Sequence, residues 1–225
     1  MSLKNVFESH TLLGQLPQEL VDQLQALSRT QTYTNNQAIF FKGDPASGMM
    51  TLVSGSVKIV SYASNGKEII FKVLGPGEVL GEIALIDGGN RTAEARAIGA
   101  TELLFFDRKD FLPLLETDPT LCIALLKVLC QRLRSTDEQL EDFTFLDLRL
   151  RLAKCLVQLG SQHLESDPSG KDVRIIASQQ MLASMMGATR EAVNKRLREW
   201  EEGGMLSLGR GFVILHDLEA FKKVV

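Results

Sequence analysis

The chain has 225 residues, of which 44% are hydrophobic, and a formal net charge of −3. Such a chain can build cores in two modest domains without disulfides. It contains no apolar run near the roughly 20 residues of a membrane span, and it does not open with a charged-then-apolar leader. We therefore expect a soluble, cytoplasmic protein with no membrane partner. The three cysteines, Cys122, Cys130 and Cys155, are scattered through helical patterns, which predicts buried thiols.

Charge is divided unevenly along the chain. Residues 1–144 carry 13 Lys/Arg against 18 Asp/Glu, a balance of −5, whereas residues 145–225 carry 12 against 10, a balance of +2. Affinity for nucleic acid comes from local neutralisation of phosphates, so a balance of +2 is informative only where the basic residues cluster. They cluster in one predicted helix of the second half.

A run of short strands is predicted between Ala38 and Asp107. Apolar stretches are separated there by Gly-Asp, Ser-Asn-Gly and Gly-Pro-Gly, the turn chemistry of an antiparallel β unit. The stretches are AIFF, MMTLVSG, VKIVSYA, EIIFKVL and TELLFFD. A strand must end at the Gly-Pro-Gly of residues 75–77, because proline has no N–H for a ladder. The pattern predicts a β-barrel or roll.

The segment from Gly81 to Ala93, GEIALIDGGNRTA, combines a carboxylate, a turn and a guanidinium. A phosphodiester is best bound by backbone N–H groups at the start of a short helix and by a planar arginine fork, here Arg91. Thr92 adds a hydroxyl donor. Glu82 would repel the phosphate, but a carboxylate accepts well from a ribose 2′-hydroxyl. These groups suit a cyclic nucleotide; the alternative interpretation is that Glu82 and Arg91 form a surface ion pair beside a loop.

The most periodic stretch lies between the two halves. Its side chains recur at steps of four and three, which is the a/d seam of a coiled coil sustained for about three heptads. They are Cys122, Leu126, Leu129, Leu133, Thr136, Leu140 and Phe143. We expect two chains to pair along this seam, and the alternative is a helix packed on its own domain. Thr136 is the polar break, and its hydroxyl could serve a ligand in the neighbouring roll.

A second domain follows a boundary expected near residues 145–147. Apolar residues then recur at helical spacing as far as Gly160, where we expect the helix to break. After a strand, VRII, Ser178 is the predicted N-cap of a short helix, Gly187 ends that helix, and Thr189 caps a second one. This is a helix-turn-helix, and the hairpin MLSLGRGFVIL completes a winged helix.

The second helix of this motif has an apolar face and a polar face. Val193, Leu197 and Trp200 fall at i, i+4 and i+7 and should face the core. The opposite face suits a DNA major groove, because Arg and Lys bind guanine O6 and N7 and Glu accepts from cytosine N4. It holds Arg190, Glu191, Asn194, Lys195 and Arg198. The alternative is a solvent-exposed face with i,i+4 ion pairs, such as Glu191 with Lys195.

The segments KGDPASGMMTLVSGSVKI, LGPGEVLGEIAL and NRTAEARA resemble the cyclic-nucleotide-binding domain of the Crp/Fnr family of bacterial transcription regulators. With the C-terminal region, the resemblance covers nearly the whole chain. It implies an α+β fold with an N-terminal β-roll (a double-stranded β-helix or jelly roll) in residues 1–116. A dimerisation helix and hinge would occupy residues 117–146, and a winged helix-turn-helix DNA-binding domain residues 147–225. It further implies a homodimer in the bacterial cytoplasm.

The resemblance also implies a nucleotide site. In that family the cassette glutamate binds the ribose, and the arginine and hydroxyl bind the phosphate. The implied site residues are Leu80, Gly81, Glu82, Ile83, Ala84, Arg91, Thr92, Arg132, Thr136 and Asp137. Arg132 would lie near the phosphate and Thr136 at the base.

The identity of the base stays open. Asp137 departs from the best-known cyclic-AMP-binding members, which carry a hydroxyl residue there. An aspartate could accept from the adenine 6-amino group or from N1–H and the 2-amino group of guanine, and Thr92 could also reach a guanine 2-amino group. We favour cyclic AMP, which most nucleotide-responsive members use, with cyclic GMP, another effector or none as alternatives.

For DNA, the resemblance implies contacts from Ser178, Gln179, Thr189, Arg190, Glu191, Asn194, Lys195 and Arg198. Lys195 replaces an arginine common in the group, and lysine lacks the bidentate fork, so the base preference can be relaxed there. The partners implied are a pseudopalindromic duplex, with half-sites about 34 Å apart, and RNA polymerase. A nucleotide-binding regulatory subunit that docks on a protein is the other interpretation.

The sequence lacks the residues that iron–sulfur sensing, haem sensing or catalysis would need. An iron–sulfur sensor of this family needs several cysteines near the N-terminus, and the first here is Cys122. A haem sensor needs an axial ligand near the pocket, but His10, His163 and His216 fall outside the predicted roll. Without a histidine in the roll, a metal cluster or a nucleophile motif, we expect no enzyme and no metal site.

Overall fold

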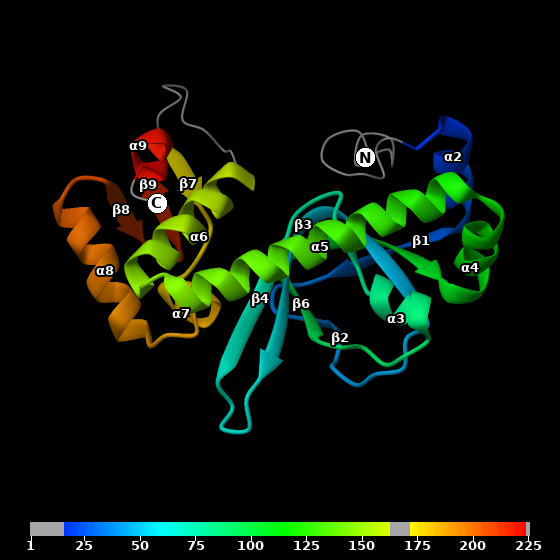
Figure 1. Ribbon diagram of the computed structural model, residues 1–225, viewed down its shortest axis with the longest axis horizontal. Helices are drawn as coiled ribbons and strands as arrows, with labels where there is room; N and C mark the ends of the chain where they lie inside the picture. Colours follow the sequence, from blue (N-terminus) through cyan, green and yellow to red (C-terminus); the bar gives the residue numbers. More distant parts are fainter. Residues whose placement is uncertain (1–15, 163–171, 224–225) are drawn as a thin grey trace. The chain divides into compact units, whose positions relative to one another are not determined.

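The structure is a computed structural model that describes residues 16–162 and 172–223; His10 and His163 lie outside this described part. The chain forms two compact units (Figure 1). The first comprises Met1–Tyr62 and Ile70–Ser135, and the second Ala63–Ile69 and Thr136–Val225. The division falls within the long central helix, and the domain boundary expected near residues 145–147 stays a prediction.

The first unit is built on an antiparallel sheet. Its strands run in the order β1-β6-β3-β4, with β2 paired to β6 and β5 paired to β3. The strands are β1 (Ser28–Tyr33), β2 (Ala38–Phe40), β3 (Gly48–Tyr62), β4 (Glu68–Leu74), β5 (Val79–Leu80) and β6 (Glu94–Asp107). The helices are α2 (Gln18–Leu27), α3 (Glu82–Asp87) and α4 (Arg108–Thr117). The expected roll is confirmed, and α3 lies between β5 and β6, where the sequence predicts the phosphate turn.

The prediction of short strands is wrong in two places. β6 has 14 residues and begins well before the predicted stretch at residues 101–107. The predicted stretches at residues 49–55 and 57–63 merge into one long strand, β3, which ends at Tyr62 and pairs with β6 through register shifts on either side of Ser54. Gly55 permits this, because its φ is +85° and a Cβ there would lie 2.4 Å from the carbonyl oxygen of Ala100. A β-bulge therefore takes the place of a turn, and the ladder continues.

Two clusters of buried side chains hold this unit together. One joins the sheet to α2, α4 and the first turns of α5 (Pro119–Phe145). In it, Phe106 and Phe111 meet edge to face with ring centroids 5.8 Å apart. The other lies within the roll and includes Leu52, Leu74 and Leu103. Full burial of such a side chain contributes roughly 1.5–3 kcal/mol, so these clusters give α3 a rigid base.

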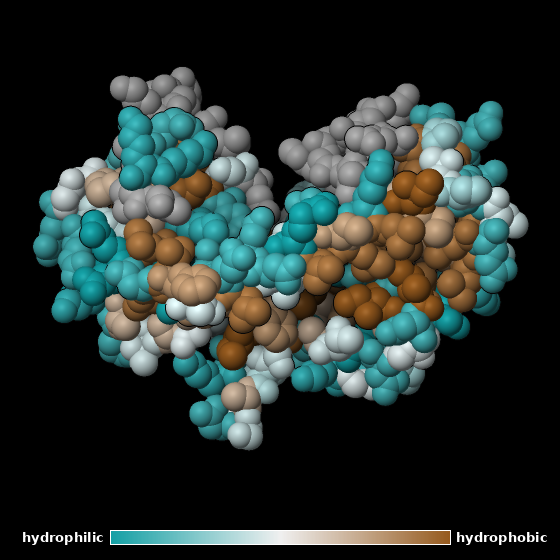
Figure 2. All heavy atoms as spheres, viewed as in Figure 1, coloured by the Kyte–Doolittle hydropathy of each residue, from teal (hydrophilic) through white to brown (hydrophobic). Residues whose placement is uncertain are grey.

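Helix α5 buries its apolar face only near its start. Leu121, Ala124 and Leu125 enter the core. Further along, four residues of the predicted seam, Leu126, Leu133, Leu140 and Phe143, are 53%, 63%, 68% and 49% exposed. Figure 2 shows apolar side chains gathered over the first half of α5 and over α3. The single chain therefore leaves the seam uncovered, and its pairing with a second chain stays a prediction.

The second unit is a winged helix-turn-helix. Its helices are α6 (Leu148–Gln162), α7 (Gln179–Met186), α8 (Arg190–Glu202) and α9 (Leu218–Lys222). An antiparallel sheet of order β7-β9-β8 consists of β7 (Val173–Ile175), β8 (Leu206–Gly209) and β9 (Phe212–Leu215). Trp200 of α8 meets Phe221 of α9 edge to face, with centroids 5.0 Å apart. Val193, Leu197 and Trp200 are all buried, so the predicted core face of α8 is confirmed.

The predicted end of α6 is wrong. The helix passes through Gly160 and continues to Gln162. Glycine is used here for close packing: a Cβ on Gly160 would lie 3.3 Å from Leu218, 3.4 Å from Val173 and 3.6 Å from Ile175. The absence of a side chain therefore lets β7 and α9 approach the helix.

The prediction of buried thiols is correct for one cysteine only. Cys155 is buried, Cys122 is half-buried and Cys130 is exposed, because α5 is packed on its own unit only at its start. Burial raises the pKa of the Cys155 thiol to about 12. Within the described residues, no helix is long and apolar enough to span a membrane, and no three His, Cys, Asp or Glu side chains gather as metal ligands would.

Candidate nucleotide pocket and nucleic-acid interface

A small pocket lies at the start of α3 in the first unit. Gly81 caps this helix with a φ of +82°, a conformation that favours glycine. The lining residues are Phe40, Ile59, Leu80, Gly81, Glu82, Ile83, Ala84, Arg91, Thr92, Ala93 and Arg132. The pocket thus brings together eight of the ten residues that the sequence assigns to the nucleotide. The other two, Thr136 and Asp137, are exposed and do not line it.

Glu82 is fully buried in the pocket wall. Its side chain is 0% exposed and forms an ion pair with Arg132 of α5. Arg132 also donates to the carbonyl oxygen of Val79 at 2.8 Å. The second carboxylate oxygen, Oε2, is buried and has no hydrogen-bond partner among the described residues. Because a buried polar atom without a partner costs roughly 1–3 kcal/mol, and more when it is charged, this oxygen is suited to a ligand that donates a hydrogen bond.

Arg91 is also buried, at 5% exposure. Its guanidinium donates to the carbonyl oxygens of Gly81 at 2.9 Å and Gly48 at 2.6 Å, and lies 4.4 Å from the ring centroid of Phe40. Burial lowers the pKa of Arg91, although the nearby charge of Glu82 acts in the opposite direction. The alternative interpretation of a surface ion pair is therefore wrong, because Glu82 and Arg91 are both inside the unit.

The pocket must widen to hold a nucleotide. Its volume is about 50 Å³, whereas one water takes up roughly 30 Å³ and small-molecule sites measure roughly 300–1,000 Å³. The side chain of Arg132 is 28% exposed and that of Glu82 is 0% exposed. Arg132 can therefore move toward solvent more readily than Glu82, and Thr92, which is exposed, can meet a ligand without rearrangement.

The helix-turn-helix of the second unit carries the predicted caps. Ser178 Oγ accepts from the backbone N–H of Met181 at 3.1 Å. Thr189 Oγ1 accepts from the backbone N–H of Ala192 at 3.2 Å. Gly187 ends α7 with a φ of +62°. Only residues 187–189 separate the two helices, so the end of α7 determines where α8 begins.

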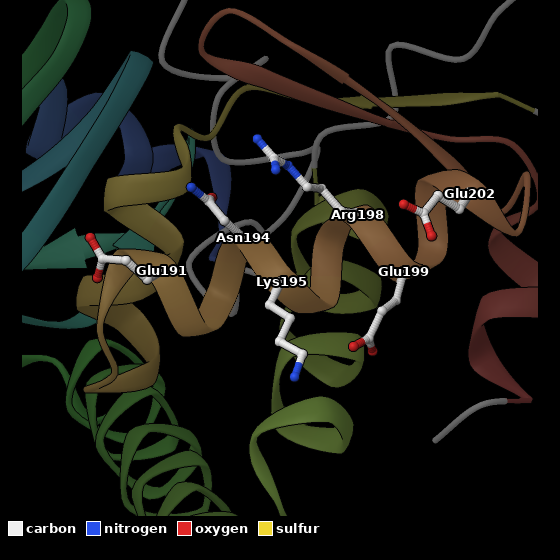
Figure 3. Close-up of a pocket in the computed structure, with 6 residues that line it drawn as sticks. All are labelled: Glu191, Asn194, Lys195, Arg198, Glu199 and Glu202. Carbon is white, nitrogen blue, oxygen red and sulfur yellow. The ribbon is translucent and has the colours of Figure 1, made fainter.

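The exposed side of α8 forms a polar face. Glu191, Asn194, Lys195, Arg198, Glu199 and Glu202 line an open hollow along it. In Figure 3, Asn194 and Arg198 project toward one side of the helix, and Lys195 and Glu199 toward the other. Within the described part of the chain, Glu191 and Lys195 form no ion pair, so the alternative i,i+4 pair is not formed. Both side chains are exposed and can contact a ligand.

The sequence reasoning missed contacts that brace the wing. The guanidinium carbon of Arg174 in β7 lies 4.1 Å from the ring centroid of Phe212 in β9. His216, directly after β9, contacts Ser207 of β8 through Nε2 at 2.7 Å and Asp172 through Nδ1 at 3.1 Å. These contacts link all three strands of the wing. Arg174 with Phe212 and Asp172 with His216 join residues far apart in the chain, whereas Ser207 and His216 are only nine residues apart across the predicted hairpin.

Comparison with known proteins agrees with this geometry. Residues 30–118 match the cyclic nucleotide-binding domain, and residues 150–224 match the Crp-like helix-turn-helix domain. The chain is 32% identical over 200 residues to the CRP-like cAMP-activated global transcriptional regulator of Mycobacterium tuberculosis, covering 89% of this chain and 88% of that one. It is 32% identical over 211 residues to the cyclic AMP receptor protein of Thermus thermophilus, covering 94% of each. The solved structure of the c-di-GMP responsive global regulator CLP of Xanthomonas campestris has a TM-score of 0.77 at 25% identity, over 89% of this chain and 99% of that one.

The fold and the two matched domains define a transcription regulator that carries a cyclic nucleotide-binding domain. The chain belongs to the CRP/FNR family of transcriptional regulators. Its relatives regulate transcription and are not enzymes, which confirms the expectation drawn from the sequence.

Proposed function

We propose that the protein is a homodimeric, sequence-specific DNA-binding regulator switched by a cyclic nucleotide bound in the α3 pocket, with cyclic AMP the favoured effector. The observation that carries the proposal is Glu82, a fully buried carboxylate with one unpartnered oxygen, in the same pocket as the buried guanidinium of Arg91 on which its charge acts. A buried anion next to a buried cation suits a ligand that has a hydroxyl donor and an anionic group a few ångströms apart. The ribose and cyclic phosphate of a cyclic nucleotide provide both.

Each side chain then has a defined part in binding. Glu82 Oε2 accepts from the ribose 2′-hydroxyl. The phosphate meets Arg91, the Thr92 hydroxyl and the N–H groups at the start of α3. The ribose displaces Arg132 from Glu82, and the Arg132 side chain turns toward the phosphate. Thr136 meets the base, from its own helix or from that of the partner chain.

Three effectors are distinguished by their chemistry. The relatives named as cAMP-activated and as a cyclic AMP receptor support cyclic AMP. Cyclic GMP is the alternative, because Asp137 could accept two hydrogen bonds from a guanine edge. A structural neighbour is named as c-di-GMP responsive, which makes this larger dinucleotide a third ligand to test.

The DNA interface is proposed on α8. Ser178, Gln179 and Thr189 would contact phosphates at the starts of the two helices. Base edges would be met by Arg190, Glu191, Asn194, Lys195 and Arg198. Pairing of two chains along the α5 seam would present two such helices to successive major grooves, with half-sites about 34 Å apart. The nucleotide must bind the DNA-competent arrangement more tightly than the other arrangement, or it switches nothing.

The test is calorimetric titration of the purified chain with cyclic AMP, cyclic GMP and cyclic di-GMP, followed by selection of duplexes from a random pool with and without each ligand. We expect cyclic AMP to bind and to raise affinity for one pseudopalindromic site. If no nucleotide binds and the selected site is bound equally tightly in all samples, the proposal is wrong.

A regulator that docks on a protein is the competing function. Salt separates the two, because a DNA complex with several phosphate contacts weakens steeply as salt rises. Glu191→Ala gives a second criterion: it should relax the base preference of the selected site and leave the salt-sensitive nonspecific binding intact. An unaltered site profile would argue against base reading by α8.

A further inference from the structure

The last turn of α5 is fastened to α6 by two contacts within the second unit. Asp142 forms an ion pair with Lys154 at 2.7 Å. One turn earlier on α6, the guanidinium carbon of Arg151 lies 4.5 Å from the ring centroid of Phe143. Two contacts on adjacent turns fix both the position and the rotation of the end of α5 against α6.

Phe143 and Arg151 also reach the turn of the helix-turn-helix. A Cβ added to Gly187 would lie 3.8 Å from Cε1 of Phe143, so the ring lies next to this glycine. Arg151 Nη1 donates a long hydrogen bond of 3.5 Å to the carbonyl oxygen of Met186. Met186 ends α7, Gly187 is its left-handed cap, and Thr189 caps α8 only two residues later. The ring of Phe143 therefore packs against the short connection that determines where α8 begins.

We propose that Phe143, held by Arg151, is a positioning residue for the DNA-reading helix: it transmits the position of the end of α5 to the start of α8. This inference rests on the proposed function, since it concerns how the nucleotide controls DNA binding. A change in α5 at the pocket moves the ring of Phe143, and the ring moves Gly187 and the first turn of α8. A small displacement is enough, because packed contacts switch between discrete arrangements.

Two substitutions test the joint from its two sides. Phe143→Ala removes the ring, but Phe143 is also a seam residue, so a loss of dimer could mimic the effect. Arg151→Met lies on α6 and leaves the seam intact. Methionine keeps most of the side-chain length, and the Nε that is lost is buried without a hydrogen-bond partner. Arg149→Met is the matched control, because Arg149 is exposed on the same helix two residues before Arg151.

The measurement is the ratio of DNA affinities with and without cyclic AMP, on the duplex that the wild-type chain selects. Phe143→Ala and Arg151→Met should each lower this ratio by roughly two- to thirtyfold, the range for residues that carry coupling between sites. Phe143→Tyr, which keeps the ring, and Arg149→Met should retain the wild-type ratio. Calorimetry should show that every variant still binds cyclic AMP, and sedimentation that Arg151→Met keeps the oligomeric state of the wild type.

A second readout comes from Trp200, the single tryptophan of the chain, which is buried in α8. A cyclic-AMP-induced change in its fluorescence should be present in the wild type and lost in Arg151→Met. If Arg151→Met retains the wild-type ratio, or if Arg149→Met loses as much as Arg151→Met, the positioning role is wrong. If cyclic AMP does not change the DNA affinity of the wild type, both the proposed function and this inference are wrong. If cyclic AMP raises the DNA affinity of the wild type, and Phe143→Ala and Arg151→Met keep the same ratio, only this inference is wrong.

Discussion

Glu82→Gln should weaken binding of cyclic AMP by roughly five- to 60-fold, because a neutral hydrogen bond replaces a charge-assisted one. The substitution keeps the size of a fully buried side chain and removes its negative charge. A hydrogen bond to a charged group contributes roughly 1.5–3 kcal/mol, against roughly 0.5–1.5 kcal/mol for a neutral one, and each 1.4 kcal/mol is about a factor of ten in affinity. The larger end of the range applies here, because Oε2 is buried and has no competing donor among the described residues.

The assay is a cycle of two proteins and two ligands, measured by calorimetry. Cyclic AMP and its 2′-deoxy analogue are titrated into the wild type and into Glu82→Gln. The loss should appear with cyclic AMP and largely vanish with the analogue, which has no hydroxyl for Glu82. Glu78→Gln is the matched control, because Glu78 pairs with Lys72 at 2.7 Å and does not line the pocket. An equal loss with both ligands would refute the assignment of Glu82 to the ribose.

Three further substitutions test the roles of the buried Arg91, the exposed Leu133 and the buried Cys155. Arg91→Ala should lower the free energy of unfolding by about 1–3 kcal/mol, because the buried carbonyl oxygen of Gly48 loses its Arg91 donor; urea denaturation measures this, and an unchanged midpoint would contradict the inward role of the guanidinium. Leu133→Lys should convert the proposed dimer to a monomer in sedimentation equilibrium, because it places a charge on the exposed apolar seam, whereas Glu138→Lys on the other face of α5 should not. Burial raises the pKa of Cys155 to about 12, above the value of about 8.5 for an unfolded thiol, so the unfolded state releases this proton first. Above pH 9, the free energy of unfolding should then fall by about 1.4 kcal/mol per pH unit. Cys155→Ala should remove this pH dependence. If the variant shows the same pH dependence as the wild type, the Cys155 thiol is not its cause.

The sequence predicted best where function depends on local chemistry. A glycine with positive φ, a hydroxyl that caps a helix and an arginine nine residues after a glutamate are all visible in a short segment. Gly81, Ser178 and Thr189 accordingly have the conformations or hydrogen bonds expected of them. The buried face of α8 was equally predictable, because the spacing of its apolar residues shows directly which side of the helix is buried.

The sequence predicted least where contacts join distant segments. The ion pair of Glu82 with Arg132 spans 50 positions in the chain, and no local pattern indicates that these two side chains meet in the pocket wall. Gly160 reads as a helix breaker, yet its neighbours from β7 and α9 explain why the helix continues. The bulge at Gly55 likewise depends on the partner strand β6, which the residues of β3 do not specify.

The most direct test of nucleotide-controlled DNA binding is the affinity for cyclic AMP measured with and without a saturating amount of the selected duplex. Coupling between two sites is reciprocal. The DNA should therefore raise the affinity for cyclic AMP by the same factor by which cyclic AMP raises the affinity for DNA. If the affinity for cyclic AMP is the same with and without the duplex, the pocket and the DNA-reading helix are not coupled, and the account is contradicted.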